Sequence, residues 1–177
     1  LAAGANIEVL HQAGGGRAEE VEKAYRGEGV SEACVVPFID DVASELGRAH
    51  LVVARSGAGT LAEIAAVGRP SLLVPFPHAA DDHQAKNAAA FAEAGAAISI
   101  REEAADPVRL ATEILALASD EVRLRKMAEA ARTLGHPNAA REIAEDFLLL
   151  ARGKLGDRRA AEKDRGDPPA HLASMGA

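Results

Sequence analysis

Short apolar runs and longer amphipathic stretches alternate along the first hundred residues. The apolar runs are rich in Val, Ile and Leu, and those in the middle of the chain are apolar on both faces. This is typical of strands that are buried between two layers of helices. The alternation predicts βαβ units with right-handed crossovers and a parallel sheet. The expected strands are 7–10, 34–36, 51–54, 71–74 and 97–100, and the expected helices between them are 19–25, 42–46, 60–67 and 84–93.

Beyond residue 105 the apolar positions follow only the helical period. Asp106 followed by Pro107 is a typical helix start, and two further helices are expected to begin near Asp120 and Asn138. Each of the three carries one apolar stripe, which we interpret as a contact with the core. The stripes are Val108, Ala111, Leu115 and Ala118, then Leu124, Met127, Ala131 and Leu134, and last Ile143, Phe147 and Leu150.

Composition narrows the class of protein. The 177 residues include 41 alanines, which favours helices packed closely on a sheet over an aromatic-rich sandwich. The single cysteine, Cys34, excludes an internal disulfide framework, and we expect it to be an inert residue of a buried strand. A net charge of −7 argues against binding to nucleic acid. No apolar run could span a bilayer and no signal peptide opens the sequence, which favours a cytoplasmic protein.

The end of the chain differs from the rest. Residues 151–177 carry a net charge of +2, against −9 for residues 1–150, and they are rich in Gly and Pro but poor in large apolar side chains. Such a segment cannot bury enough surface to offset the entropy of ordering it. We therefore expect one domain over 1–150 and a disordered tail over 151–177. The sequence starts at Leu1, inside the end of an expected helix, so we also expect it to be a piece of a longer chain.

The turn after the expected strand 51–54 suits a phosphate ligand. Residues 55–59, Arg-Ser-Gly-Ala-Gly, are mostly small and lead directly into a helix, so a ligand can approach the free N–H groups of the helix start. Glu63 follows about one turn later, where a carboxylate could bind the hydroxyls of a ribose. Alternatively, Gly57 and Gly59 only make a tight turn and Glu63 is a solvated helix residue.

A second polar segment, residues 75–87, follows the next expected strand and therefore projects from the same carboxyl edge of the sheet. His83, Gln84 and Asn87 fall on one helical turn and could present imidazole and amide groups to sugar hydroxyls. His78, Asp81, Asp82 and His83 have no spacing typical of a zinc site, so we expect no metal there. We interpret Gly14–Gly16 as a loop rather than a phosphate contact.

Together these segments resemble the MurG family of bacterial peptidoglycan glycosyltransferases. The resemblance spans roughly residues 5–150 and rests on seven motifs, RSGAGTLAEI (55–64), GRP (68–70), VPFPH (74–78), DHQAKN (82–87), HQAG (11–14), PFIDD (37–41) and EAGAA (93–97). It implies a GT-B architecture of two Rossmann-like domains, in which this chain is the donor-binding C-terminal domain without its first strand and helix. It also implies transfer of N-acetylglucosamine (GlcNAc) from UDP-GlcNAc to lipid I, giving lipid II, with no cofactor, at the cytoplasmic side of the bacterial inner membrane.

The resemblance assigns roles to individual positions. Ile39 would meet the uracil through its backbone, and Glu63 would bind the ribose. His83 and Gln84 would contact the GlcNAc, with Asn87 close behind. No catalytic residue is implied in this chain, because the expected base and the acceptor site belong to the absent N-terminal domain. The positions that would line the diphosphate are Ala58, Gly59, Thr60 and Leu61.

Two other functions remain open on the sequence. Another GT-B enzyme, such as a diacylglycerol glucosyltransferase or a UDP-GlcNAc 2-epimerase, would share the nucleotide site. A nucleotide-sugar-binding subunit of a split transferase, working only with a membrane-bound partner chain, would share the same half of the fold.

Overall fold

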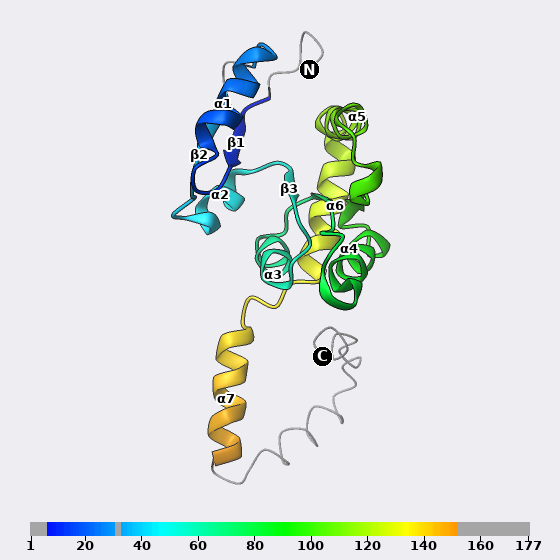
Figure 1. Cartoon of the computed structure of the whole chain (residues 1–177). Coiled ribbons are helices and arrows are strands. Elements are labelled where there is room, and N and C mark those ends of the chain that lie inside the picture. Colours follow the sequence, from blue (N-terminus) through cyan, green and yellow to red (C-terminus); the bar gives the residue numbers. More distant parts are fainter. Residues whose placement is uncertain (1–6, 31–32, 152–177) are drawn as a thin grey trace.

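The computed structural model describes residues 7–30 and 33–151, in which strands and helices alternate before three final helices (Figure 1). All five expected strands form, each within two residues of its expected bounds. The expected tail lies outside the described residues, except for Ala151, which ends the last helix. The strands are β1 (Val9–Gln12), β2 (Ala33–Val36), β3 (Val52–Ala54), β4 (Ser71–Leu73) and β5 (Ala97–Ser99). The helices are α1 (Ala18–Gly27), α2 (Val42–Arg48), α3 (Ala58–Val67), α4 (His83–Glu93), α5 (Pro107–Ala118), α6 (Glu121–Thr133) and α7 (Ala139–Ala151), with short 3₁₀ turns η1 (Ala80–Asp82) and η2 (Glu102–Ala104).

Every strand pairing is parallel, as expected, but the described strands form two sheets rather than one. β1 pairs with β2, while β3, β4 and β5 form a separate sheet in that order. In a doubly wound sheet of order 3-2-1-4-5-6, the first strand separates the second and third from the fourth to sixth. β1 and β2 fit the second and third positions and β3–β5 fit the last three. The division between the two sheets therefore falls at the place that the first strand holds in this order.

Helix ends follow the local signals in the sequence. The Asp106 carboxylate accepts hydrogen bonds from the N–H groups of Val108 and Arg109, which caps α5 as predicted. Gly68 ends α3 with φ of 69°, a left-handed conformation that a side chain would strain, and its N–H bonds to the carbonyls of Ile64 and Ala65. These caps fix where each helix stops, and so where the loops at the sheet edge begin.

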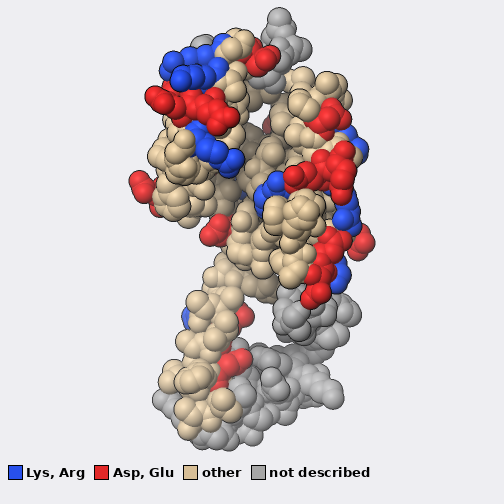
Figure 2. Space-filling view, in the orientation of Figure 1, with Lys and Arg blue, Asp and Glu red and all other residues tan. Residues whose placement is uncertain are grey.

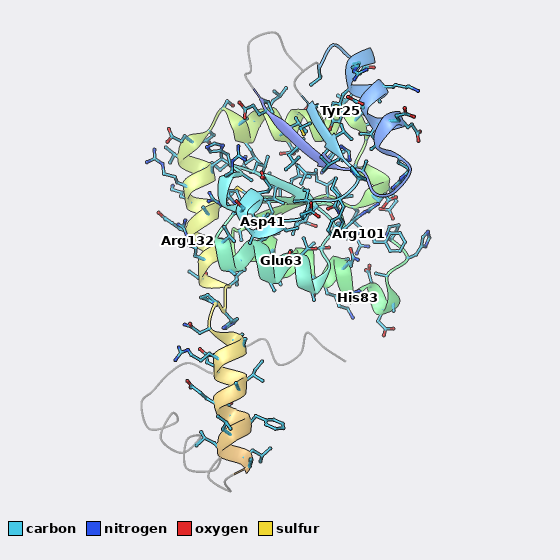
Figure 3. The ribbon with its side chains drawn as sticks, turned by 90° about the vertical axis from the view of Figure 1, so that its left-hand side faces the viewer. Tyr25, Asp41, Glu63, His83, Arg101 and Arg132 are labelled. Carbon is cyan, nitrogen blue, oxygen red and sulfur yellow. The ribbon has the colours of Figure 1, made fainter. Side chains whose placement is uncertain are left out.

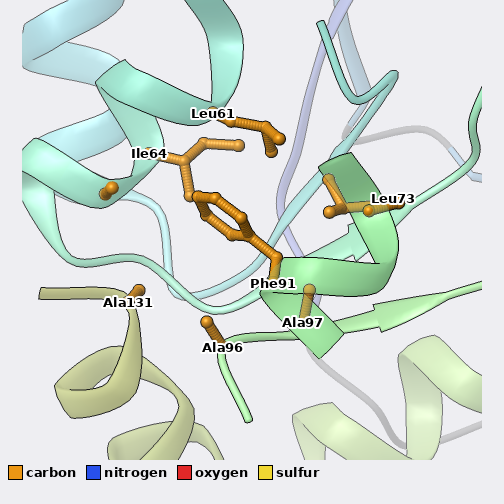
Figure 4. Packing of buried hydrophobic residues seen from close by; sticks show 9 residues of the cluster. Leu61, Ile64, Leu73, Phe91, Ala96, Ala97 and Ala131 are labelled. Atoms are coloured by element: carbon orange, nitrogen blue, oxygen red, sulfur yellow. The ribbon is translucent and has the colours of Figure 1, made fainter. Parts of the chain in front are cut away.

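The main core lies between α3, α4, α6 and the three-stranded sheet (Figure 4). Ile64 of α3 packs beside Phe91 of α4, and Ala131 of α6 closes the cluster from the other side. Small side chains such as Ala96 and Ala97 let the helices lie close to the strands. The high alanine content is thus used as expected, and it holds α3 and α4 in fixed positions on the sheet.

α7 corrects the expectation that its apolar stripe contacts the core. Ile143, Phe147 and Leu150 are all exposed, with Phe147 71% exposed. Figure 1 shows α7 standing away from the other helices, and its surface in Figure 2 is largely uncharged. The predicted helix is confirmed, but an amphipathic period does not indicate which surface covers the apolar side of a helix.

Cys34 corrects a second expectation, because it is exposed. It stands opposite Leu10 in the β1–β2 ladder, and Leu10 is also exposed, at 41%. α1 lies on the other face, where the Tyr25 ring meets the His11 ring edge to face and its hydroxyl lies 3.1 Å from Nδ1 of His11. Because α1 covers only that face of the β1–β2 ladder, β2 is not buried on both faces, and Cys34 on the opposite face is exposed.

The contact between α1 and β1 should depend on pH. Burial raises the pKa of the Tyr25 phenol above its ordinary value of 10.0, so the folded protein holds this proton more tightly than the unfolded chain. The stabilisation is therefore complete below pH 10 and is lost as the pH rises above it. Chemical denaturation from pH 8 to 11 should show the wild type losing stability relative to Tyr25→Phe. A constant difference between the two proteins would contradict this.

A tight contact fixes the end of α6 against α3. A Cβ atom at Gly135 would lie 2.6 Å from the Ala65 carbonyl oxygen, which is backbone and cannot move aside. We expect Gly135→Ala to lower the free energy of unfolding by about 1–3 kcal/mol in urea denaturation. The control is Gly47→Ala, where an added Cβ meets nothing within 4 Å and a helix-favouring residue replaces glycine within α2. Equal stability of the two variants would show that the contact is not tight.

Candidate functional site

The amino end of α3 is open to a ligand. Gly57 precedes the helix with extended backbone and offers no side-chain cap, and the first turn holds no acidic residue. No described group accepts a hydrogen bond from the N–H of Ala58, Gly59 or Thr60, and all three residues are exposed. Free N–H groups and the positive end of the helix dipole together favour an anion at this position. Leu61 differs, because its side chain is 3% exposed in the core and its N–H bonds to the Gly57 carbonyl.

Glu63 lies farther along the same helix on its exposed side. Leu61, Ile64 and Ala65 form the buried side, while Gly59 and Glu63, four residues apart, share the outer one. At 1.5 Å per residue, the Glu63 backbone stands about 7.5 Å along the axis from that of Ala58. This spacing separates an anion at the helix start from a hydroxyl-binding carboxylate by roughly the length of a sugar phosphate. Glu63 makes no ion pair with any residue in the described part of the chain.

The start of α4 forms the second part of the site. His83 is exposed, and its Nδ1 lies 2.6 Å from the Ala80 carbonyl oxygen, so Nδ1 is the donor in this bond and Nε2 is left for a ligand. Gln84 accepts a hydrogen bond at Oε1 from the N–H of Phe76, 3.1 Å away, which leaves its amide nitrogen for a ligand. Figure 3 labels His83 at the start of α4 and Glu63 on α3. His83 and Gln84 can thus both form hydrogen bonds with sugar hydroxyls.

Buried hydrogen bonds join these two parts. Ser56, which is fully buried, donates from Oγ to the Gln84 carbonyl oxygen at 2.7 Å. Asn87, 6% exposed, donates from Nδ2 to the Ser56 carbonyl oxygen at 3.1 Å. The structure therefore uses the Asn87 amide to fix the turn before α3. Ser56 belongs to the sequence motif 55–64, but neither its residue type nor its spacing predicts this role.

The turn before α4 is conformationally strained. Asp81 and Asp82 have φ values of 50° and 55°, in the left-handed region that side chains seldom adopt. The Asp82 carboxylate does not cap α4 but pairs with Arg101 at 3.0 Å, from the segment after β5. Strained residues of this kind often accompany functional sites.

Ile39 lies in the β1–β2 part of the protein. Its N–H donates to Oε1 of Gln12 at 2.9 Å, so the backbone group left for a base is the carbonyl. Gln12 ends β1 and Ile39 follows β2, which puts this contact at the carboxyl end of both strands. Like Ala58 and His83, Ile39 therefore follows the carboxyl end of a parallel strand, where ligands bind in such folds.

The described residues contain no helix that is both long and apolar enough to cross a membrane. Within the same residues, no three His, Cys, Asp or Glu side chains are grouped so that they could hold a metal ion. The groups that the candidate site offers to a ligand are the backbone amides at the start of α3, the Glu63 carboxylate and the side chains of His83 and Gln84.

Comparison with known proteins identifies the family of this chain. A family model described as the glycosyltransferase family 28 C-terminal domain matches residues 1–145. The chain belongs to this family. Family 28 relatives include a UDP-N-acetylglucosamine–N-acetylmuramyl-(pentapeptide) pyrophosphoryl-undecaprenol N-acetylglucosamine transferase of Sorangium cellulosum, 45% identical over 98% of this chain and 46% of the relative. The protein of the same name from Aromatoleum aromaticum is 49% identical over 82% of this chain and 40% of its own length.

Solved structures place the family 28 domain in the same fold. MurG of Acinetobacter baumannii superposes with a TM-score of 0.72 at 32% identity, covering 78% of this chain and 42% of that protein. The glycotransferase of kitacinnamycin, at 24% identity and a TM-score of 0.56, shares the fold over 78% of this chain and 34% of its own. The chain spans less than half the length of these relatives. The matches confirm the resemblance to the MurG family and the expected Rossmann-like GT-B fold.

The buried bond from Asn87 can be tested by stability. Asn87→Ala removes the donor to the Ser56 carbonyl, which stays buried without a partner, so unfolding should require about 1–3 kcal/mol less in urea denaturation. Lys86→Ala, an exposed neighbour on α4, should change stability by less than about 0.5 kcal/mol. If both variants unfold at the same urea concentration, the bond does not hold the turn.

Proposed function

We propose that this chain is the donor-binding domain of an enzyme that transfers GlcNAc from UDP-GlcNAc to lipid I, forming lipid II. The observation that carries the proposal is the uncapped amino end of α3, with three free N–H groups beside Glu63 on the exposed side of the helix. The names of the relatives support this donor and acceptor over the glucosyltransferase and epimerase alternatives.

The diphosphate is bound at the helix start. The N–H groups of Ala58, Gly59 and Thr60 donate to its oxygens, and the helix dipole stabilises the negative charge. The same groups act during transfer, because the sugar–phosphate bond breaks and UDP departs with additional negative charge. Fixed donors that need not reorganise at this moment lower the barrier.

The nucleoside and the sugar lie on either side of the diphosphate. Glu63 accepts hydrogen bonds from the ribose hydroxyls, and the Ile39 carbonyl accepts from the uracil. The His83 Nε2 and the Gln84 amide nitrogen bind the GlcNAc hydroxyls, because their other atoms are already occupied by the protein. Asn87 acts on the sugar through the Ser56 turn, and Leu61 supports the helix from the core.

The remaining chemistry comes from outside this chain. We assign no described residue as the base that deprotonates the acceptor hydroxyl, and we propose that this domain uses no cofactor. The undecaprenol in the relatives' names is a long hydrocarbon that partitions into a membrane, so the acceptor is reached there. We therefore propose that the whole enzyme works as a peripheral protein at the cytoplasmic side of the inner membrane, with the lipid bound by another domain.

Glu63 provides the sharpest test. Two hydrogen bonds to a carboxylate, each contributing about 1.5–3 kcal/mol, are lost in Glu63→Ala, so the affinity for UDP should fall at least about tenfold in isothermal titration calorimetry. Glu63→Gln should bind more weakly than wild type but better than Glu63→Ala, since an amide oxygen accepts less strongly.

The control is Glu129→Ala, which removes an exposed glutamate from α6. It should bind UDP as the wild type does. Unchanged UDP affinity in Glu63→Ala would remove the ribose assignment, and absence of UDP binding by the wild-type chain would contradict the proposed function.

A further inference from the structure

Arg55 connects the three loops at the carboxyl edge of the β3–β4–β5 sheet. It stands directly after β3, and its Nη1 lies 3.2 Å from the Val74 carbonyl oxygen and 3.1 Å from that of Pro75, both after β4. The same nitrogen pairs with the Glu102 carboxylate in η2, after β5. One side chain thus bonds to the ends of two neighbouring strands.

The guanidinium is also packed against the β4 loop. Its Cζ lies 5.7 Å from the centre of the Phe76 ring, within the range of a cation–π contact. The Phe76 N–H in turn donates to Gln84 Oε1, so the residue that Arg55 touches also orients the side chain at the start of α4. All three polar contacts of Arg55 come from one nitrogen, Nη1, while the planar guanidinium stays within reach of the ring. The compact ammonium of a lysine does not stack on an aromatic ring in this way.

We propose that Arg55 is a positioning residue that sets the distance between the diphosphate end and the sugar end of the donor site. This inference rests on the proposed function. The diphosphate end is the start of α3, two residues after Ser56, and the sugar end is His83 and Gln84. Arg55 holds the β4 loop to the β3 end, while the buried Ser56 bond holds α4 to the same turn.

The pairing with Glu102 distinguishes this role from direct phosphate binding. The Glu102 carboxylate offsets the positive charge of Arg55, and its bonded nitrogen faces the β4 carbonyls. A residue used only to attract a diphosphate would gain nothing from an acidic partner. The arrangement therefore favours fixing the loops over neutralising the ligand.

The experiment compares Arg55→Gln and Arg55→Lys with Arg48→Gln, which breaks an exposed pair with Glu45 on α2. Hydrogen–deuterium exchange of the free 177-residue chain should be at least threefold faster over residues 76–84 in both Arg55 variants and unchanged in Arg48→Gln. Calorimetry should show UDP affinity within twofold of wild type but UDP-GlcNAc affinity reduced at least threefold, because only the sugar end is displaced. Arg55→Lys, although it keeps the positive charge, should not restore the affinity for UDP-GlcNAc.

Other results overturn the inference. Unchanged exchange over 76–84 would show that Arg55 does not fix the loop, and equal losses for UDP and UDP-GlcNAc with unchanged exchange would make it a phosphate ligand instead. Faster exchange with both affinities unchanged would remove the positioning role. If the wild-type chain binds neither nucleotide, the proposed function fails, whereas the exchange comparison still decides whether Arg55 fixes the loop.

Discussion

The buried hydrogen bonds of Ser56 determine how the candidate site is assembled. The turn between β3 and α3 must leave the helix start uncapped if it is to receive an anion, so it cannot be stabilised by a capping side chain of its own. Ser56 restrains this turn instead, because its buried hydroxyl donates to the Gln84 carbonyl and its carbonyl accepts from the Asn87 amide. The exposed helix start and the buried bonds beneath it are therefore two consequences of one constraint.

This constraint also explains the strain and the ion pairs around the site. α4 must begin close to α3, and the chain reaches it through two residues in the left-handed region, Asp81 and Asp82. Arg101 holds Asp82 from the end of β5, and Arg55 holds the β4 loop from the end of β3. Exposed ion pairs contribute little stability singly. The Arg101–Asp82 and Arg55–Glu102 pairs, however, each join segments that are separate in sequence, and so they fix the position of the loops.

The sequence predicted most of the fold, because strand and helix periods are local properties. Asp106 and Gly68 act at helix ends as their residue types imply. The exposure of Cys34 and Phe147 was not predictable, since burial depends on which neighbour covers a face and not on the pattern within an element. Likewise the motif around Gly57 indicated a phosphate site, but the role of Ser56 depends on α4, which is distant in sequence.

The central claim is that the free N–H groups at the start of α3 bind the diphosphate of a nucleotide. Titration of UDP into ¹⁵N-labelled protein, followed by amide chemical shifts, observes these groups directly. The account predicts that the amides of Ala58, Gly59 and Thr60 show the largest changes and saturate together. Largest changes at Gly14–Gly16, with the α3 amides unmoved, would contradict it.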